Sequence, residues 1–218
     1  MAAYHFAFDL NYFGFIPRQN FYNDPFWTWQ RTMIVSVFMF CVGLGQAVAL
    51  EEGQRWPRFW RRWGQIAGCA VLVSIGSWLM FGPRFIWFGV LHGIALMLIV
   101  ARATGDWARW LWPLGLVAVL LPQWLAHPFF DTRWTGWIGL VTRKPPTEDY
   151  APLLPWLGVV WWGVAAGRWT LRRRRRWIAG PLPRALHPLA VLGRWSLSFY
   201  MLHQPVLIGL LYLATLLR

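Results

Sequence analysis

Charged side chains are scarce in this chain: Asp, Glu, Lys and Arg together make up 13% of its 218 residues. A soluble domain usually carries about 25% charged residues, which it needs to cover its surface. Hydrophobic residues instead make up 57% of the chain. This composition excludes an ordinary soluble protein. It predicts a protein dissolved in a lipid bilayer, where backbone polar groups must be satisfied internally.

Acidic residues are especially few: 8 Asp and Glu stand against 21 Lys and Arg, and the formal net charge is +13. On a soluble protein such a charge would suggest nucleic-acid binding. Here the basic residues lie in loops between apolar runs, so we expect no nucleic-acid partner. One alternate set of loops holds most of the arginines, including the run 172–176. Because basic loops stay in the cytoplasm, the N-terminus is predicted to be cytoplasmic and the C-terminus to lie on the opposite side.

Cysteines and metal-binding patterns are also rare. The two cysteines, Cys41 and Cys69, both fall inside apolar runs, so they are predicted to be small buried thiols rather than a disulfide. No pair of histidines has the H-x-x-x-H spacing that would place two zinc ligands on one helix face. We therefore expect no metal site.

Long runs without Asp, Glu, Lys or Arg dominate what is present. A spanning helix needs about 20 mostly apolar residues. Six runs approach this length, at residues 32–50, 63–83, 85–101, 110–130, 150–167 and 195–217. Residues 1–16 add a seventh run, which is short and contains Asp9, so we expect it to be the second half of a helix that begins upstream of Met1. The predicted fold class is all-α: a polytopic membrane helix bundle of about seven transmembrane helices, forming one domain over residues 1–218.

Four Asp or His side chains lie inside the predicted spans and away from their loop ends: His5, Asp9, His92 and His203. Such residues are costly in a bilayer, usually face the bundle interior and often mark a functional path. His5 and Asp9 are spaced i and i+4, so they share a helix face and the carboxylate could orient the imidazole of a general base. A polar pair that holds two helices together explains the spacing equally well. For His92 and His203, an interhelical hydrogen bond is the simpler interpretation.

The segment 149–158 precedes and enters the sixth run, and it combines Asp149, Tyr150 and Trp156 with two prolines and a glycine. Irregular backbone at membrane depth is tolerated where it lines a cavity. Aromatic rings beside carboxylates suit a sugar-like ligand. An ordinary helix entrance, with acidic residues favoured by the helix dipole, fits the same residues.

Segments 4–10, 88–93, 149–158 and 193–205 together resemble the bacterial members of the heparan-alpha-glucosaminide N-acetyltransferase catalytic-domain family of transmembrane acyltransferases. The resemblance covers essentially the whole chain. It implies a protein of the bacterial inner membrane that moves an acetyl or other acyl group from cytoplasmic acyl-CoA to an acceptor on the periplasmic side. The acceptor would be a glycan, another sugar-like molecule or a different small molecule.

The resemblance assigns catalysis to His5, with Asp9 orienting it and His92 and His203 lining the same cavity. Acetyl-CoA or another acyl-CoA would be the co-substrate, and its phosphates would meet four arginines on the cytoplasmic side: Arg58, Arg61, Arg62 and Arg194. Plain positive-inside topology explains each of these arginines as well. The alternative function is a proton-coupled transporter or flippase of a small or lipid-linked solute, and a third is a non-catalytic membrane subunit. The expected partners are the lipid bilayer, acyl-CoA and the acceptor. The oligomeric state stays open, and a homodimer is one of the assemblies considered.

Overall fold

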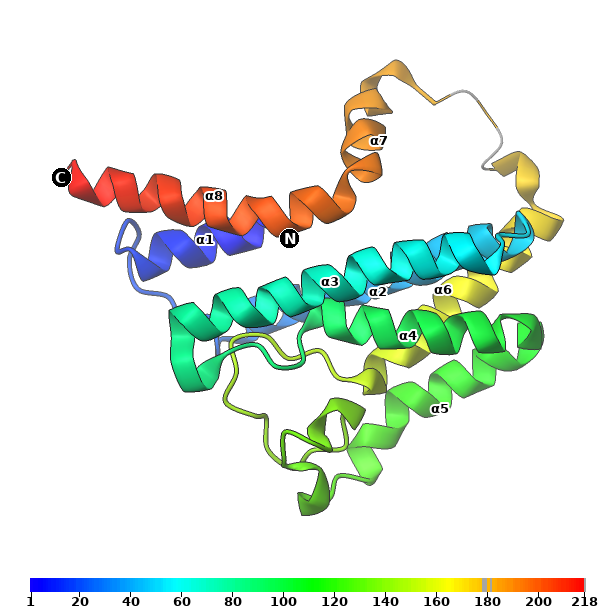
Figure 1. Ribbon diagram of the computed structural model, residues 1–218, viewed down its shortest axis with the longest axis horizontal. Helices are drawn as coiled ribbons and strands as arrows, with labels where there is room; N and C mark the ends of the chain where they lie inside the picture. Colours follow the sequence, from blue (N-terminus) through cyan, green and yellow to red (C-terminus); the bar gives the residue numbers. More distant parts are fainter. Residues whose placement is uncertain (178–179, 181, 218) are drawn as a thin grey trace. The chain divides into compact units, whose positions relative to one another are not determined.

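The structure is a computed structural model that describes residues 1–177, 180 and 182–217 (Figure 1). Within these residues the regular structure is helical and no strand is present; an isolated bridge joins Phe88 to Tyr150. The chain forms two compact units: a terminal unit of Met1–Val35 and Gly180–Arg218, and a central unit of Ser36–Ala179. The all-α prediction is confirmed.

The described part of the chain contains eight α-helices. Seven of them lie on the seven predicted apolar runs: α1 (Ala2–Tyr12), α2 (Pro25–Glu51), α3 (Trp56–Phe81), α4 (Val90–Thr104), α5 (Leu111–Trp124), α6 (Leu153–Arg173) and α8 (Ser196–Leu216). The eighth, α7 (His187–Arg194), lies in a segment that the sequence predicted to be a loop.

Among the residues that the structure describes, four helical segments are long and apolar enough to cross a bilayer: Pro25–Glu51, Trp56–Arg84, Val90–Trp107 and Ser196–Leu216. With 11 and 14 residues, α1 and α5 are shorter than the roughly 20 residues that a span needs. With 21 residues α6 is long enough, but it is not among the four. The structure thus shows a helical protein with several candidate membrane spans, and the number seven stays a prediction.

Two helices begin seven residues earlier than the charge-free runs predicted. The first, α2, starts at Pro25 because Asp24 accepts a hydrogen bond from the Phe26 N–H (2.8 Å) and proline suits the first helical position. Similarly, α3 starts at Trp56, again with a proline in its first turn. The predicted boundaries fell at Arg31 and Arg62, but both helices continue through these arginines.

Two other predicted helices extend beyond the observed ones, one at its start and one at its end. Instead of beginning at residue 85, α4 starts at Val90, because the residues before it are extended and Phe88 accepts a hydrogen bond from the Ala151 N–H (3.3 Å). The helix predicted over 110–130 ends at Trp124, two residues after the internal Pro122. A proline lacks the N–H and strains the preceding turn, so the chain leaves the helix there.

Glycines let α6 pack closely against two neighbours in the central unit. A Cβ on Gly43 of α2 or on Gly163 of α6 would collide with a backbone oxygen of the facing helix. The same holds between α5 and α6 at Gly115 and Gly158. Association of helices in lipid depends on van der Waals packing rather than on burial from water, and small residues permit this close approach.

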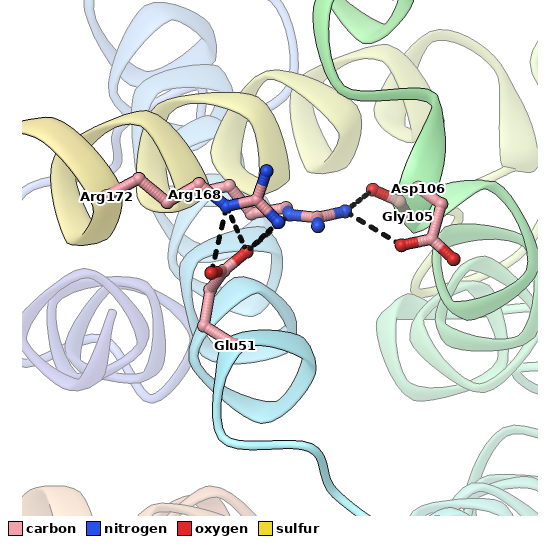
Figure 2. Close-up of polar contacts among 5 residues, drawn as sticks. All are labelled: Glu51, Gly105, Asp106, Arg168 and Arg172. Atoms are coloured by element: carbon pink, nitrogen blue, oxygen red, sulfur yellow. Dashed lines mark hydrogen bonds and ion pairs between the residues drawn. The ribbon is translucent and has the colours of Figure 1, made fainter.

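Ionic contacts join three segments at the C-terminal end of α6 (Figure 2). Arg168 is 8% exposed and lies 2.7 Å from Glu51 at the end of α2 and 3.2 Å from Asp106. It also donates to the Gly105 carbonyl oxygen. Arg172, one turn later, reaches Glu51 at 2.8 Å. Four charges and one carbonyl thereby hold α2, α6 and the segment after α4 together.

The two thiols are free, and they are not buried as predicted. Cys41 is exposed on α2, and Cys69 is half-buried on α3. A thiol behaves as a small apolar group, so such a position suits a helix surface covered by lipid.

Candidate functional site

Two helices of the terminal unit bring together three of the four predicted catalytic residues. Figure 1 shows α1 beside α8, and both run in the same direction. The rings of His5 and His203 meet edge to face, with centroids 5.2 Å apart. Asp9, 4% exposed, accepts hydrogen bonds from the Gln204 amide at 2.9 and 3.1 Å. The cluster of His5, Asp9, His203 and Gln204 is called the α1–α8 cluster below.

Hydrogen bonding determines the tautomer of His203. Its Nδ1 lies 3.0 Å from the Phe199 carbonyl oxygen and 2.8 Å from that of Tyr200. Because a carbonyl oxygen only accepts, Nδ1 carries the proton of the neutral ring and Nε2 keeps a lone pair. Nε2 is buried and has no hydrogen-bond partner among the described residues. The ring that touches His5 therefore offers an unoccupied proton acceptor.

Asp9 has a different described partner from the one predicted. The i, i+4 spacing suggested that it orients His5, but both of the hydrogen bonds described at its carboxylate come from Gln204, 195 residues away in the sequence. Gln204 was not among the residues predicted from the sequence, although an amide next to a histidine in an apolar helix is itself a signal of an intramembrane polar contact. Orientation of His5 by Asp9 stays a prediction.

Aromatic side chains surround the N-terminal helix within the terminal unit. Phe21 is 2% exposed and stacks on Trp27 with ring centroids 4.0 Å apart. Tyr4 and Phe8 of α1 meet Phe21 edge to face, at 5.7 and 5.3 Å. A groove of about 490 Å³ lies beside this cluster, lined by residues of 8–12 and 18–22. These contacts hold α1 against the start of α2, and thereby hold His5 and Asp9 in place.

His92, the fourth predicted catalytic residue, belongs to the central unit, where both of its ring nitrogens are occupied. The Gly89 N–H donates to Nδ1 (3.3 Å), and Nε2 lies 3.1 Å from the Ser74 hydroxyl. That hydroxyl donates its proton to the Ile86 carbonyl oxygen (2.6 Å), so Nε2–H must be the donor to Ser74. His92 thus caps α4 and ties it to α3. A catalytic role for it stays a prediction.

The predicted acceptor-binding residues take part in local structure. Asp149 accepts from the Val90 N–H (2.7 Å) and so caps α4. Tyr150 donates its hydroxyl proton to the Gly136 carbonyl oxygen (2.6 Å), and burial raises the pKa of this phenol, so it remains a donor. Trp156 is half-buried on the turn after Leu154, whose backbone is non-helical. Binding of an acceptor by these residues stays a prediction.

Residues 126–149, between α5 and α6, contain two short 3-10 turns (Pro128–Phe130 and Gly136–Ile138) and are called the cap below. The Asp131 carboxylate accepts from the side chain and backbone N–H of Thr142, at 2.5 and 2.7 Å. Glu148 pairs with Arg84 at 2.7 Å, and Arg133 donates to the Pro83 carbonyl oxygen (2.9 Å). The cap is thereby attached to the segment between α3 and α4.

The four arginines expected to meet coenzyme phosphates fall in two places. Arg58, Arg61 and Arg62 are exposed in the first two turns of α3 in the central unit, whereas Arg194 ends α7 in the terminal unit. Of the three on α3, Arg58 lines a cleft of about 640 Å³ at the turn between α2 and α3. Within the described residues, no group of three or more His, Cys, Asp or Glu side chains is arranged to hold a metal ion.

Comparison with known proteins gives one result. The sequence model of the family described as "Heparan-alpha-glucosaminide N-acetyltransferase, catalytic" matches residues 1–205. No curated protein and no solved structure matches the chain. The match includes the whole central unit and the part of the terminal unit that contains the α1–α8 cluster.

Proposed function

Because the chain belongs to the heparan-alpha-glucosaminide N-acetyltransferase catalytic family, we propose that it is a membrane-embedded acyltransferase. It takes an acetyl or other acyl group from cytoplasmic acyl-CoA and passes it to a sugar-like or other acceptor on the periplasmic side. Acetyl-CoA is the donor that the family suggests. One domain over residues 1–218, seven spans, a cytoplasmic N-terminus, a periplasmic C-terminus and a place in the bacterial inner membrane belong to the same proposal.

The observation that supports this function best is the α1–α8 cluster. It contains two imidazoles in ring contact, one of which has a buried nitrogen with no hydrogen-bond partner in the described part of the chain. It also contains a buried carboxylate held by an amide. General-base catalysis needs an unprotonated nitrogen near the reacting group and a negative charge that stabilises the imidazolium formed. This cluster provides both between two mainly apolar helices.

The reaction divides into a bond made and a bond broken. The acceptor nitrogen or oxygen attacks the thioester carbonyl carbon, the C–S bond breaks and CoA leaves as the thiolate. His5 removes the acceptor proton, or first carries the acyl group on its own ring nitrogen. Nε2 of His203 receives the proton that His5 must pass on. Asp9, held by Gln204, balances the positive charge that develops on the histidines.

The other predicted site residues keep their roles as parts of the proposal. Asp149, Tyr150 and Trp156 bind the acceptor. His92 keeps its predicted role toward the developing oxyanion, for which its Nε2–H has to leave the Ser74 hydroxyl. The arginines Arg58, Arg61, Arg62 and Arg194 attract the phosphates of the coenzyme.

Acetyl-CoA hydrolysis and acyl labelling by purified protein test the proposal. We expect slow hydrolysis by the wild type and a loss of about 100-fold or more in His5→Ala, because removal of a general base costs 10²–10⁴ in rate. His187→Ala is the matched control, since His187 is an exposed histidine at the start of α7. An acyl group trapped on His5 would identify this residue as the carrier.

Hydrolysis that His5→Ala leaves intact would contradict the proposal, as would a protein that binds no acetyl-CoA. In the second case, proton-coupled flux in vesicles becomes the next measurement, because buried histidines also suit a transporter.

A further inference from the structure

Helix α7 has little within its own segment to keep it helical. It is eight residues long, no side-chain hydrogen bond caps its start, and none of its residues is buried. An isolated helix shorter than about 12–15 residues is marginal in water, and helices in proteins gain most of their stability by packing an apolar face. We therefore expect a surface outside this segment to cover α7.

The apolar face of α7 is a stripe of large side chains. These side chains recur at every third residue and are all exposed: Leu186, Leu189, Leu192 and Trp195. Residues three apart are neighbours on a helix surface, so the four form one continuous strip, called the α7 stripe below. His187 and Arg194 are seven residues apart and share the opposite face. Helix α7 is therefore amphipathic.

The charge around α7 is positive and has no acidic counterpart nearby in the sequence. Arg184 precedes the helix, Arg194 ends it, and no Asp or Glu follows Asp149 in the chain. A helix with one apolar face and one basic face lies in the plane of a membrane surface, with its apolar face at the boundary of headgroups and acyl chains. Its basic residues are attracted to anionic headgroups.

Chain connectivity brings α7 to such a surface. Only Trp195 separates it from α8, which is long and apolar enough to span a bilayer. Trp195 has φ −103° and ψ 21°, so the helix is interrupted there. Figure 1 shows α7 running across the direction of α8 rather than continuing it, and both belong to the terminal unit. A helix that runs across a span at its end lies along the membrane plane.

We propose that α7 binds the surface of an anionic phospholipid bilayer, with the α7 stripe inserted at the acyl-chain boundary and His187 and Arg194 facing headgroups and water. This binding fixes the level of the start of α8 in the membrane. His203 and Gln204 lie about two turns further along α8, so it also fixes the depth of the α1–α8 cluster. The binding requires no enzymatic activity and does not rest on the proposed function.

Spin labels on the full chain, in nanodiscs that contain phosphatidylglycerol, test the proposal. The two native thiols are first removed by Cys41→Ala and Cys69→Ala, and single labels are then attached to Leu189→Cys, Leu192→Cys or His187→Cys. Collisions with oxygen, which concentrates in lipid, and with a water-soluble nickel chelate give the depth of each label. We expect the labels at 189 and 192 about 5–10 Å inside the bilayer surface. The label at 187, on the opposite face of the same helix, is the matched control and should meet the chelate.

Two other patterns would overturn the proposal. Equal access of the chelate to all three labels would place α7 in water. Labels at 189 and 192 that neither oxygen nor the chelate reaches would show that protein covers the α7 stripe, either the central unit or a second copy of the chain.

Hydrogen exchange provides a test without labels. Leu189→Gln combined with Leu192→Gln removes half of the α7 stripe, and α7 should lose the protection of its amides that the wild type shows in the same nanodiscs. Val191→Gln is the matched control, because Val191 is exposed on the same helix one turn after His187 and should leave the protection intact. Equal protection in the two variants would contradict the role of the stripe.

Acetyl-CoA hydrolysis is measured in the same preparations, which separates the two proposals. An inactive protein with inserted labels would contradict the proposed function and support the placement of α7. An active protein whose labels at 189 and 192 meet the chelate would contradict the placement of α7 and leave the proposed function standing.

Discussion

Replacing Arg168 by glutamine should destabilise the protein far more than replacing either of its charged neighbours. The side chain of Arg168 is buried, donates to the Gly105 carbonyl oxygen and pairs with Glu51 and Asp106 (Figure 2). Glutamine keeps a polar group of similar length but removes the charge and the fork of donors. The change leaves the Gly105 carbonyl without this donor and Glu51 with Arg172 alone.

The structure supplies the expected magnitudes. Removing one partner of a buried ion pair costs about 3–5 kcal/mol, and we expect about 3 kcal/mol because Arg172 still lies 2.8 Å from Glu51. The side chains of Arg172 and Asp106 are 53% and 90% exposed, so their own pairs are largely screened by solvent. Arg172→Gln and Asp106→Asn should therefore each cost at most about 1 kcal/mol.

Thermal unfolding in detergent, followed by circular dichroism, is the assay. For a chain of this size about 1 kcal/mol corresponds to roughly 2–4 °C, so Arg168→Gln should lower the Tm by roughly 6–12 °C. The two control variants should lower it by at most about 4 °C. Equal losses in Arg168→Gln and Arg172→Gln, or a loss below about 2 °C in Arg168→Gln, would refute the assignment of Arg168 as the central group of the cluster.

Three further predictions concern other polar groups. Gln204→Leu leaves the Asp9 carboxylate without its described donor and should reduce both the Tm and acetyl-CoA hydrolysis, whereas Gln204→Asn should recover part of the hydrolysis; equal activity in the two variants would contradict a positioning role. Ser74→Ala should lower the free energy of unfolding by about 1–3 kcal/mol, because it leaves the Nε2–H of His92 unpaired. An unchanged Tm would argue against the role of His92 in tying α4 to α3. The Thr142 hydroxyl and backbone N–H hold the pKa of Asp131 below its ordinary value, so this carboxylate stabilises the cap above its unfolded pKa and loses that effect as pH falls through the folded pKa. Asp131→Asn should consequently accelerate hydrogen exchange in the cap at neutral pH and have little effect in acid, and a difference of the same size at both pH values would contradict this.

Much of the fold follows from residue-level properties. Apolar runs predicted the position of every long helix, and α8 differs from its predicted run by one residue at each end. Errors arose where an arginine was taken as a boundary, as at Arg31 and Arg62. A long basic side chain can leave the apolar face of a helix and reach water or headgroups, so it does not need to end the helix.

The candidate site was predicted only in part. The i, i+4 spacing correctly placed His5 and Asp9 on one short helix. The free-energy cost of ionisable side chains in a bilayer indicated that both make polar contacts. The partner of Asp9 could not be read from that helix, because Gln204 is 195 residues away and α8 alone brings it there. Ser74 was missed for the same reason: it meets His92 across two helices.

The amino-acid sequence by itself determined that this protein is a helical membrane protein with a few ionisable side chains in its apolar helices. Hydropathy and helix propensity are properties of short segments, and each residue contributes its own transfer free energy wherever the chain goes. The tertiary structure decided how the ring nitrogens of two similar histidines, His92 and His203, are paired. His92 accepts from Gly89 and donates to Ser74, while His203 is held by two carbonyl oxygens through Nδ1, and its Nε2 has no hydrogen-bond partner within the described segments. Hydrogen bonds require partners at about 3 Å with suitable directions, and only the packing of distant segments supplies them.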